Sequence, residues 1–136
     1  MIYRQIRVTM KPEVPEDEVQ RGLELLRTLG RELDVVEFWM VGRDFGSEFE
    51  YGALYALKDI DAYRSYMFAP LHRQIDEFGL PRVAKITAND LTDDPDPQIG
   101  AKIAEIQAAR LAGDPGLVEL SERLGFNEGS GTTTSA

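Results

Sequence analysis

The chain has 136 residues, no cysteine, one histidine, and 24 acidic against 15 basic side chains. This length suits one domain with a single core. The lack of cysteine excludes disulfides, thiol catalysis and thiolate metal sites, and a single histidine excludes a zinc site that needs two imidazoles. The net charge of −9 argues against binding to nucleic acid or to anionic membranes, because both attract basic surfaces.

The sequence contains no recognisable targeting or membrane-spanning segment. Residues 1–10 alternate in polarity and contain two arginines, unlike the hydrophobic region of a signal peptide. No apolar run approaches the roughly 18 residues that a bilayer requires. We therefore expect a cytoplasmic protein.

The first two thirds of the chain predict alternating strands and helices. Period-two alternation indicates a strand, while apolar residues three or four apart indicate a helix with one buried stripe. The predicted elements are a strand over 2–10, a helix over 16–33, strands over 35–41 and 49–57, a helix capped by Asp59 and ending at Met67, a helix over 71–78, and a strand over 83–91.

This β-α-β-β-α-β order predicts an α+β, ferredoxin-like fold, in which an antiparallel sheet has its helices on one face. The first strand presents mostly apolar residues to the helices and a mixed set to the other face, including Tyr3, Gln5, Arg7 and Thr9. A second subunit can cover that other face. The fold itself does not select a function.

The composition changes after residue 91. Residues 92–97 hold three aspartates and two prolines and predict a linker, with Asp96 as the N-cap of the next helix and Pro97 as its first residue. Two amphipathic helices should follow, separated by Gly113–Pro115. Their apolar stripes consist of Ile99, Ile103 and Ile106, and of Leu117, Leu120 and Leu124.

We therefore expect a barrel domain over 1–91, an acidic linker and helical extension over 92–125, and a disordered tail over 126–136. Short helices of this kind are marginal alone, so they must pack on something. One interpretation is that they pack on the same domain or its dimer mate. The other is a docking arm for a partner protein, or a lid over a pocket.

His72 is the only histidine, and it lies among aromatic residues. Residues 63–72 contain three aromatic rings, a proline and this histidine. Imidazole has an unperturbed pKa near about 6.5, so His72 can serve as a general base, and Tyr66 can donate a hydrogen bond to a developing oxyanion. The alternative is a kinked helix in which the rings pack in the core and His72 is merely hydrogen-bonded.

Arg4 interrupts the apolar face of the first strand. An unpaired buried charge is costly, so this guanidinium needs a partner or a polar pocket. Arg4 therefore extends to solvent or pairs with an acid, or else it binds a carboxylate, phosphate or enolate in a pocket.

Four short segments occur in the order and spacing of a known family. They are Lys11-Pro12-Glu13-Val14, Val41-Gly42-Arg43-Asp44, Glu50-Tyr51, and Ala69-Pro70-Leu71-His72, the last being similar to a His-Pro-Ala-His signature. On these segments, residues 1–91 resemble the stress-responsive dimeric α/β-barrel (Dabb) family.

The resemblance implies ferredoxin-like protomers whose sheets pair into a barrel, and hence a homodimer. It extends to polyketide cyclases of the olivetolic acid cyclase type, in which the second histidine of the signature is the base and a tyrosine six residues earlier assists it. Those positions match His72 and Tyr66 here. This sequence departs from the pattern at Ala69, Arg4 and Ala53, where the cyclases have histidines.

Together these features predict a cofactor-independent and metal-independent enzyme that abstracts a proton α to a carbonyl of a small organic substrate. The resemblance implies cyclase or aldol-type chemistry and a polyketide-like or aromatic substrate. His72 and Tyr66 are the expected catalytic residues. The expected substrate-binding residues are Arg4, Tyr51, Tyr55 and Phe68. The alternatives are a non-catalytic small-molecule-binding or stress-associated dimer module, and a cofactor-free oxygenase.

Overall fold

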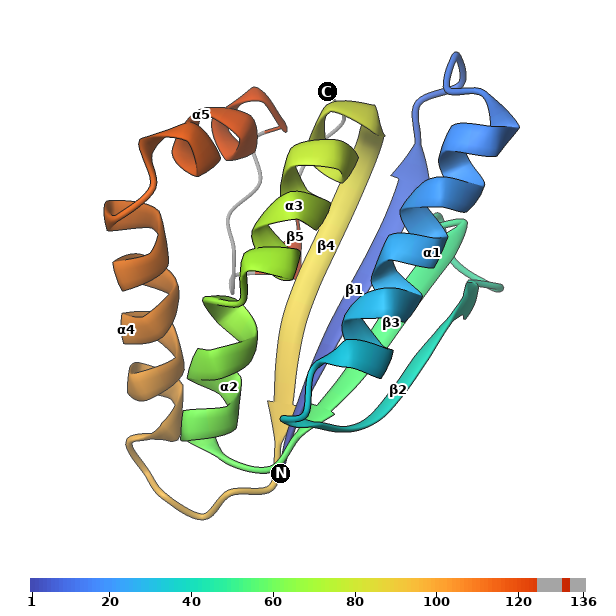
Figure 1. Ribbon diagram of the computed structural model, residues 1–136. Helices are drawn as coiled ribbons and strands as arrows, with labels where there is room; N and C mark the ends of the chain where they lie inside the picture. Colours follow the sequence, from blue (N-terminus) through green and yellow to red (C-terminus); the bar gives the residue numbers. More distant parts are fainter. Residues whose placement is uncertain (125–130, 133–136) are drawn as a thin grey trace.

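A computed structural model describes residues 1–124 together with Gly131 and Thr132. Its elements follow the predicted order and continue into the C-terminal extension (Figure 1). They are β1 (Ile2–Met10), α1 (Glu16–Glu32), β2 (Val36–Arg43), β3 (Tyr51–Leu57), α2 (Ile60–Met67), α3 (Pro70–Gly79), a 3-10 turn (Leu80–Arg82), β4 (Val83–Thr92), α4 (Ile99–Ala112), α5 (Pro115–Leu124) and β5 (Gly131–Thr132). The expected α+β, ferredoxin-like core is thus confirmed.

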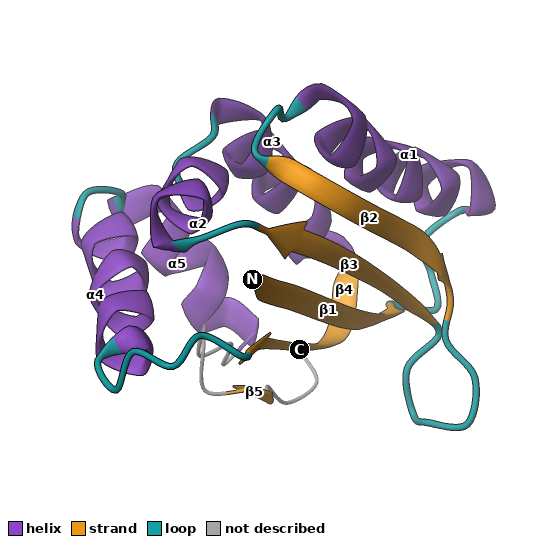
Figure 2. Cartoon of the chain, turned by 90° about the horizontal axis from the view of Figure 1, so that it is seen from below, coloured by secondary structure: helices purple, strands orange, loops and turns teal. Residues whose placement is uncertain are grey.

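The antiparallel sheet has the strand order β2-β3-β1-β4-β5. Helices α1, α2 and α3 lie on one face, here called the inner face, and no helix of the described chain packs on the opposite, outer face (Figure 2). The register places Arg4 of β1 opposite Tyr55 of β3 on one side and opposite Asp90 of β4 on the other. All three side chains therefore project toward the helices.

Local sequence accounts for the helix ends. Glu16, Asp17 and Glu18 occupy the first turn of α1, where negative charge stabilises the positive end of the helix dipole. The side chain of Asp59 accepts a hydrogen bond from the backbone nitrogen of Ala62 and so caps α2, as predicted. Pro70 begins α3, where its missing N–H costs nothing.

Several predicted boundaries differ from the structure by one or two residues. Strand β2 continues through Gly42 to Arg43, and β3 begins at Tyr51 rather than Phe49. The prediction that Asp96 caps α4 is wrong, because Gln98 occupies the N-cap position. Asp96 instead accepts a hydrogen bond from the Gln98 backbone nitrogen at 2.9 Å, which makes a local turn ahead of the helix.

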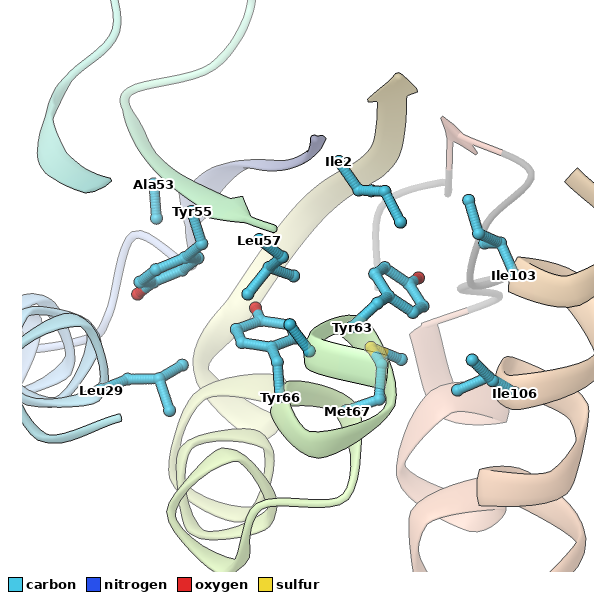
Figure 3. Close-up of a cluster of buried hydrophobic side chains, with 11 residues drawn as sticks. Ile2, Leu29, Ala53, Tyr55, Leu57, Tyr63, Tyr66, Met67, Ile103 and Ile106 are labelled. Carbon is cyan, nitrogen blue, oxygen red and sulfur yellow. The ribbon is translucent and has the colours of Figure 1, made fainter. Parts of the chain in front are cut away.

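The C-terminal extension packs on the barrel domain of its own chain. Ile103 and Ile106 of α4 join the main core cluster beside Tyr63 and Met67 of α2 (Figure 3). Leu117 and Leu124 of α5 join a second cluster. The apolar stripes of both helices thus pack against the rest of the chain, which agrees with the first of the two interpretations above.

The predicted disorder of residues 126–136 lies almost wholly outside the described residues. The exception is β5, whose Gly131 and Thr132 pair with Ala88 and Thr87 of β4.

Gly30 allows α1 to approach β2 closely. A β-carbon at this position would lie 2.3 Å from Cγ of Trp39, whose side chain packs on the core from the inner face of β2. We predict that Gly30→Ala lowers the free energy of unfolding by about 1–3 kcal/mol, because a ring held in a packed core cannot move aside without strain. Chemical denaturation followed by circular dichroism measures this change.

Gly22→Ala is the matched control on the same helix. Its β-carbon would make only ordinary contact with the Phe78 ring, at 3.6 Å, so it should be neutral or stabilising by up to about 1 kcal/mol. A Gly30→Ala protein as stable as the wild type would contradict this account of the α1–β2 contact.

Candidate active site

A mainly apolar cavity of about 90 Å³ lies between the inner face of the sheet and helices α1 and α3. Its walls come from β1, β4, α1 and α3, with Tyr66 contributed by α2. Four lining side chains can form strong hydrogen bonds, namely Arg4, Tyr66, His72 and Asp76. A concave apolar pocket with a few convergent polar groups is typical of a site for a small organic molecule.

His72 lies in the first turn of α3 and is 4% exposed. Its Nδ1 is 3.2 Å from the carbonyl oxygen of Tyr66. Because a carbonyl oxygen only accepts hydrogen bonds, this contact favours the neutral tautomer with the proton on Nδ1. In that tautomer Nε2 carries the lone pair of the ring, and it lies 3.8 Å from Oδ2 of Asp76, one helical turn further on.

Tyr66 is fully buried on α2. Its ring centroid lies 4.7 Å from that of His72 and 5.3 Å from that of Tyr55. The break between α2 and α3 at Phe68 and Ala69 turns the chain so that residues six apart become neighbours. The structure thus brings together the two residues predicted to be catalytic.

Asp76 forms an ion pair with Arg110 of α4. Burial raises the pKa of the Asp76 carboxyl, and the neighbouring Arg110 guanidinium acts in the opposite direction. The side chain of Arg110 is only 6% exposed. Asp76 therefore lies between a buried cation and the imidazole of His72.

Arg4 is buried and pairs with an acid, the second of the possibilities considered from the sequence. Its Nη1 donates to Oδ2 of Asp90 at 3.0 Å. The same oxygen accepts from the hydroxyl of Tyr63 at 3.0 Å and from Nε2 of Gln107 at 3.2 Å. Arg4 also lines the cavity, and its ion pair with Asp90 partly offsets the positive charge that it brings there.

Three predicted substrate-binding residues lie outside this cavity. The hydroxyl of the buried Tyr55 donates to the backbone carbonyl of Leu26 at 2.6 Å. Tyr51 is half-buried at the start of β3, and Phe68 is 47% exposed between α2 and α3. Of the four substrate-binding predictions, only Arg4 is brought to the cavity with His72 and Tyr66.

Sequence reasoning missed Asp76, Asp90 and Arg110. Asp76 could have been found from its spacing, because a residue four positions after His72 shares its helix face. Asp90 falls on the inner face of β4, directly opposite Arg4 in the sheet register. Arg110 lies four residues after Ile106, so it continues the buried stripe of its helix.

Over residues 1–124 and 131–132, no cluster of three or more histidine, cysteine, aspartate or glutamate side chains could hold a metal ion. Within the same described part of the chain, no helix is both long and apolar enough to cross a bilayer.

Comparison with known proteins supports the fold. No curated protein matches the chain. Solved structures that are similar include a dimeric ferredoxin-like protein of unknown function from Thermobifida fusca, with 20% identity, a TM-score of 0.61, and coverage of 67% of this chain and 89% of that chain. A Dabb family protein from Mesorhizobium loti has 20% identity, a TM-score of 0.60, and coverage of 67% and 94%. A hydroxynitrile lyase from Passiflora edulis has 12% identity, a TM-score of 0.62, and coverage of 71% and 96%.

At these identities the similar structures establish the fold alone. The family follows from the sequence itself, since residues 2–93 match the stress responsive A/B barrel domain, Dabb. The match covers β1 to β4 and ends before α4. The chain therefore belongs to the Dabb family of stress-responsive A/B barrel domains, with a helical extension added at its C-terminal side.

Proposed function

We propose that this protein is a cofactor-independent enzyme that abstracts a proton α to a carbonyl group of a small, largely apolar organic molecule. The observation behind this proposal is that His72 and Tyr66 both line one apolar cavity, with their rings 4.7 Å apart. The resemblance to polyketide cyclases adds the expected substrate class, polyketide-like or aromatic, and the expected outcome, aldol-type ring closure.

The base in this proposal is Nε2 of His72. The contact between Nδ1 and the Tyr66 carbonyl favours the tautomer with the proton on Nδ1, in which Nε2 is the atom that accepts the substrate proton. When the C–H bond breaks, the proton moves to Nε2 and the electron pair moves toward the carbonyl oxygen as an enolate. The enolate carbon then attacks a second carbonyl, and the imidazolium returns its proton to the resulting alkoxide.

The surrounding groups stabilise the charges that develop. The carboxylate of Asp76 lies 3.8 Å from Nε2 and favours the transient imidazolium. The Tyr66 hydroxyl and the Arg4 guanidinium are the donors proposed for the enolate oxygen. Apolar walls exclude water and strengthen these interactions.

A second candidate is a protein that binds a small molecule without converting it. One observation favours it: both imidazole nitrogens of His72 already have polar neighbours in the protein, the Tyr66 carbonyl and the Asp76 carboxylate. In that case the polar groups orient a ligand and no proton is transferred.

We also propose that the protein is a homodimer formed through the outer face of its sheet. Three large apolar side chains alternate with the inner-face residues of their strands and therefore belong to the outer face. Their exposed fractions are 51% for Phe38 and 56% for Met40 of β2, and 69% for Leu91 of β4. Exposed apolar groups on one face are typical of an interaction surface. The Thermobifida fusca protein of the same fold is described as dimeric.

Substitution of the proposed base should abolish proton abstraction. A panel of aryl ketones and acyl thioesters of N-acetylcysteamine is incubated with the protein in D₂O, and deuterium at the α carbon is measured by mass spectrometry. For any compound that the wild type exchanges, His72→Gln should slow exchange by roughly 100-fold or more, because a positioned base is lost. Tyr66→Phe should slow exchange by about 100-fold, because an oxyanion donor is lost.

Circular dichroism checks that His72→Gln keeps the fold. Exchange by His72→Gln at the wild-type rate would refute the assignment of the base. A compound that shifts the His72 NMR resonance but is not exchanged by the wild type would favour the binding protein instead.

The outer face should control the oligomeric state. We predict that Met40→Lys weakens the dimer by at least roughly 100-fold, because a two-fold interface buries two copies of the new charge. Analytical ultracentrifugation measures the dissociation constant. Phe68→Lys is the control, since it removes a similarly exposed apolar residue at the junction of α2 and α3, away from the sheet. A wild-type protein that is monomeric at micromolar concentration would contradict the proposed interface.

A further inference from the structure

Helix α4 lies beyond the residues that match the family, yet two of its polar side chains are buried against the family domain. Gln107 and Arg110 are each 6% exposed. They are three residues apart and so share one face of the helix. Buried polar side chains are expensive unless they are paired, and here each is paired with an acid near the cavity.

Gln107 contacts the acid that pairs with Arg4. Its Nε2 donates to the Tyr63 hydroxyl at 2.8 Å and to Oδ2 of Asp90 at 3.2 Å. Arg110 contacts the acid that faces His72, through its ion pair with Asp76. Helix α4 thus contacts both Asp90, which pairs with Arg4, and Asp76, which lies near His72.

Of these contacts, the one made by Arg110 bears directly on the proposed base. A general base must be neutral before it can accept a proton. A carboxylate 3.8 Å from Nε2 favours the imidazolium form of His72 over the neutral form. A guanidinium bound to that carboxylate removes much of this effect.

We propose that Arg110 is a positioning residue of the site, which neutralises Asp76 so that His72 stays an unprotonated base. This inference rests on the proposed function, in which His72 is the base. It assigns a role in the site to a helix that the family domain does not include, and it explains why an arginine occupies the buried stripe of α4.

Apart from Asp76 and Arg110, the charged side chains described around His72 form ion pairs with one another. On the elements around His72, the described titratable and charged groups include Tyr66 of α2, Arg73 and Asp76 of α3, Arg4 of β1, Asp90 of β4, Arg110 of α4 and Asp114 before α5. Arg4 pairs with Asp90 at 3.0 Å, and Arg73 pairs with Asp114 at 2.7 Å. Among the described contacts, Asp76 is the acid whose Oδ2 lies near Nε2, at 3.8 Å, and Arg110 is bound to that same oxygen.

The single histidine makes a direct test possible, because one ring resonance reports its protonation without any substrate. The pKa of His72 is measured by NMR titration of the full chain. Arg110→Gln should raise this pKa by about one unit, since Asp76 is left to pair with the imidazolium. Asp76→Asn should lower it by about one unit, since the carboxylate is lost and the guanidinium remains.

Three further variants separate this role from a structural one. Arg110→Lys keeps the cation and should leave the pKa of His72 close to the wild-type value. The double variant Asp76→Asn with Arg110→Gln should also return it close to that value. Arg123→Gln removes the same charge from the exposed face of α5, where Arg123 pairs only with Glu119 among the described contacts, and should have no effect.

Shifts of the same sign in Arg110→Gln and Asp76→Asn, or equal shifts in Arg110→Gln and Arg123→Gln, would overturn the proposal. Should Arg110→Gln fail to fold, Asp76→Asn decides the matter, since an unchanged or raised pKa in that variant also overturns it. Because the titration uses no substrate, opposite shifts without any deuterium exchange would contradict the proposed function while still establishing that Arg110 and Asp76 set the pKa of His72.

Discussion

Two buried ion pairs organise the inner side of this protein, Arg4 with Asp90 and Asp76 with Arg110. Breaking either pair would leave a charge in an apolar interior, which costs several kcal/mol. Each pair joins elements that are far apart in the sequence: the first joins β1 to β4, and the second joins α3 to α4. One member of each pair, Arg4 or Asp76, lines the cavity, so the polar groups of the cavity depend on these contacts, and the second pair also helps to attach the C-terminal extension.

The fold was predictable because the sequence signals that indicate its strands and helices each lie within a short stretch of chain. Alternation, helical stripes, the Asp59 cap and Pro70 each depend on a few neighbouring residues, and together they predict β-α-β-β-α-β. The error at Asp96 has the same origin, because an aspartate before a proline fits both a helix cap and the turn that the structure contains.

The site was predictable only in part. The pairing of His72 with Tyr66 follows from a motif within one stretch of chain, and the resemblance to a family pointed to it. Asp90 and Arg110 are 18 and 38 positions beyond His72 in the sequence, and they reach the site only through sheet register and helix packing. Such contacts leave no periodic pattern, although each residue interrupts an otherwise apolar face, as Arg4 does in β1. The residues expected on the cavity wall from β3, Tyr51 and Tyr55, are placed elsewhere by the same long-range packing.

The proposed mechanism requires His72 to be a neutral imidazole with its proton on Nδ1 and the lone pair of the ring on Nε2. The ¹⁵N chemical shifts of its ring, measured in the wild-type protein at neutral pH, test this claim most directly, because the two nitrogens of a neutral ring differ strongly and become similar on protonation. The account predicts a protonated Nδ1 and an unprotonated Nε2. A ring protonated on both nitrogens at neutral pH, or one with its proton on Nε2, would contradict it.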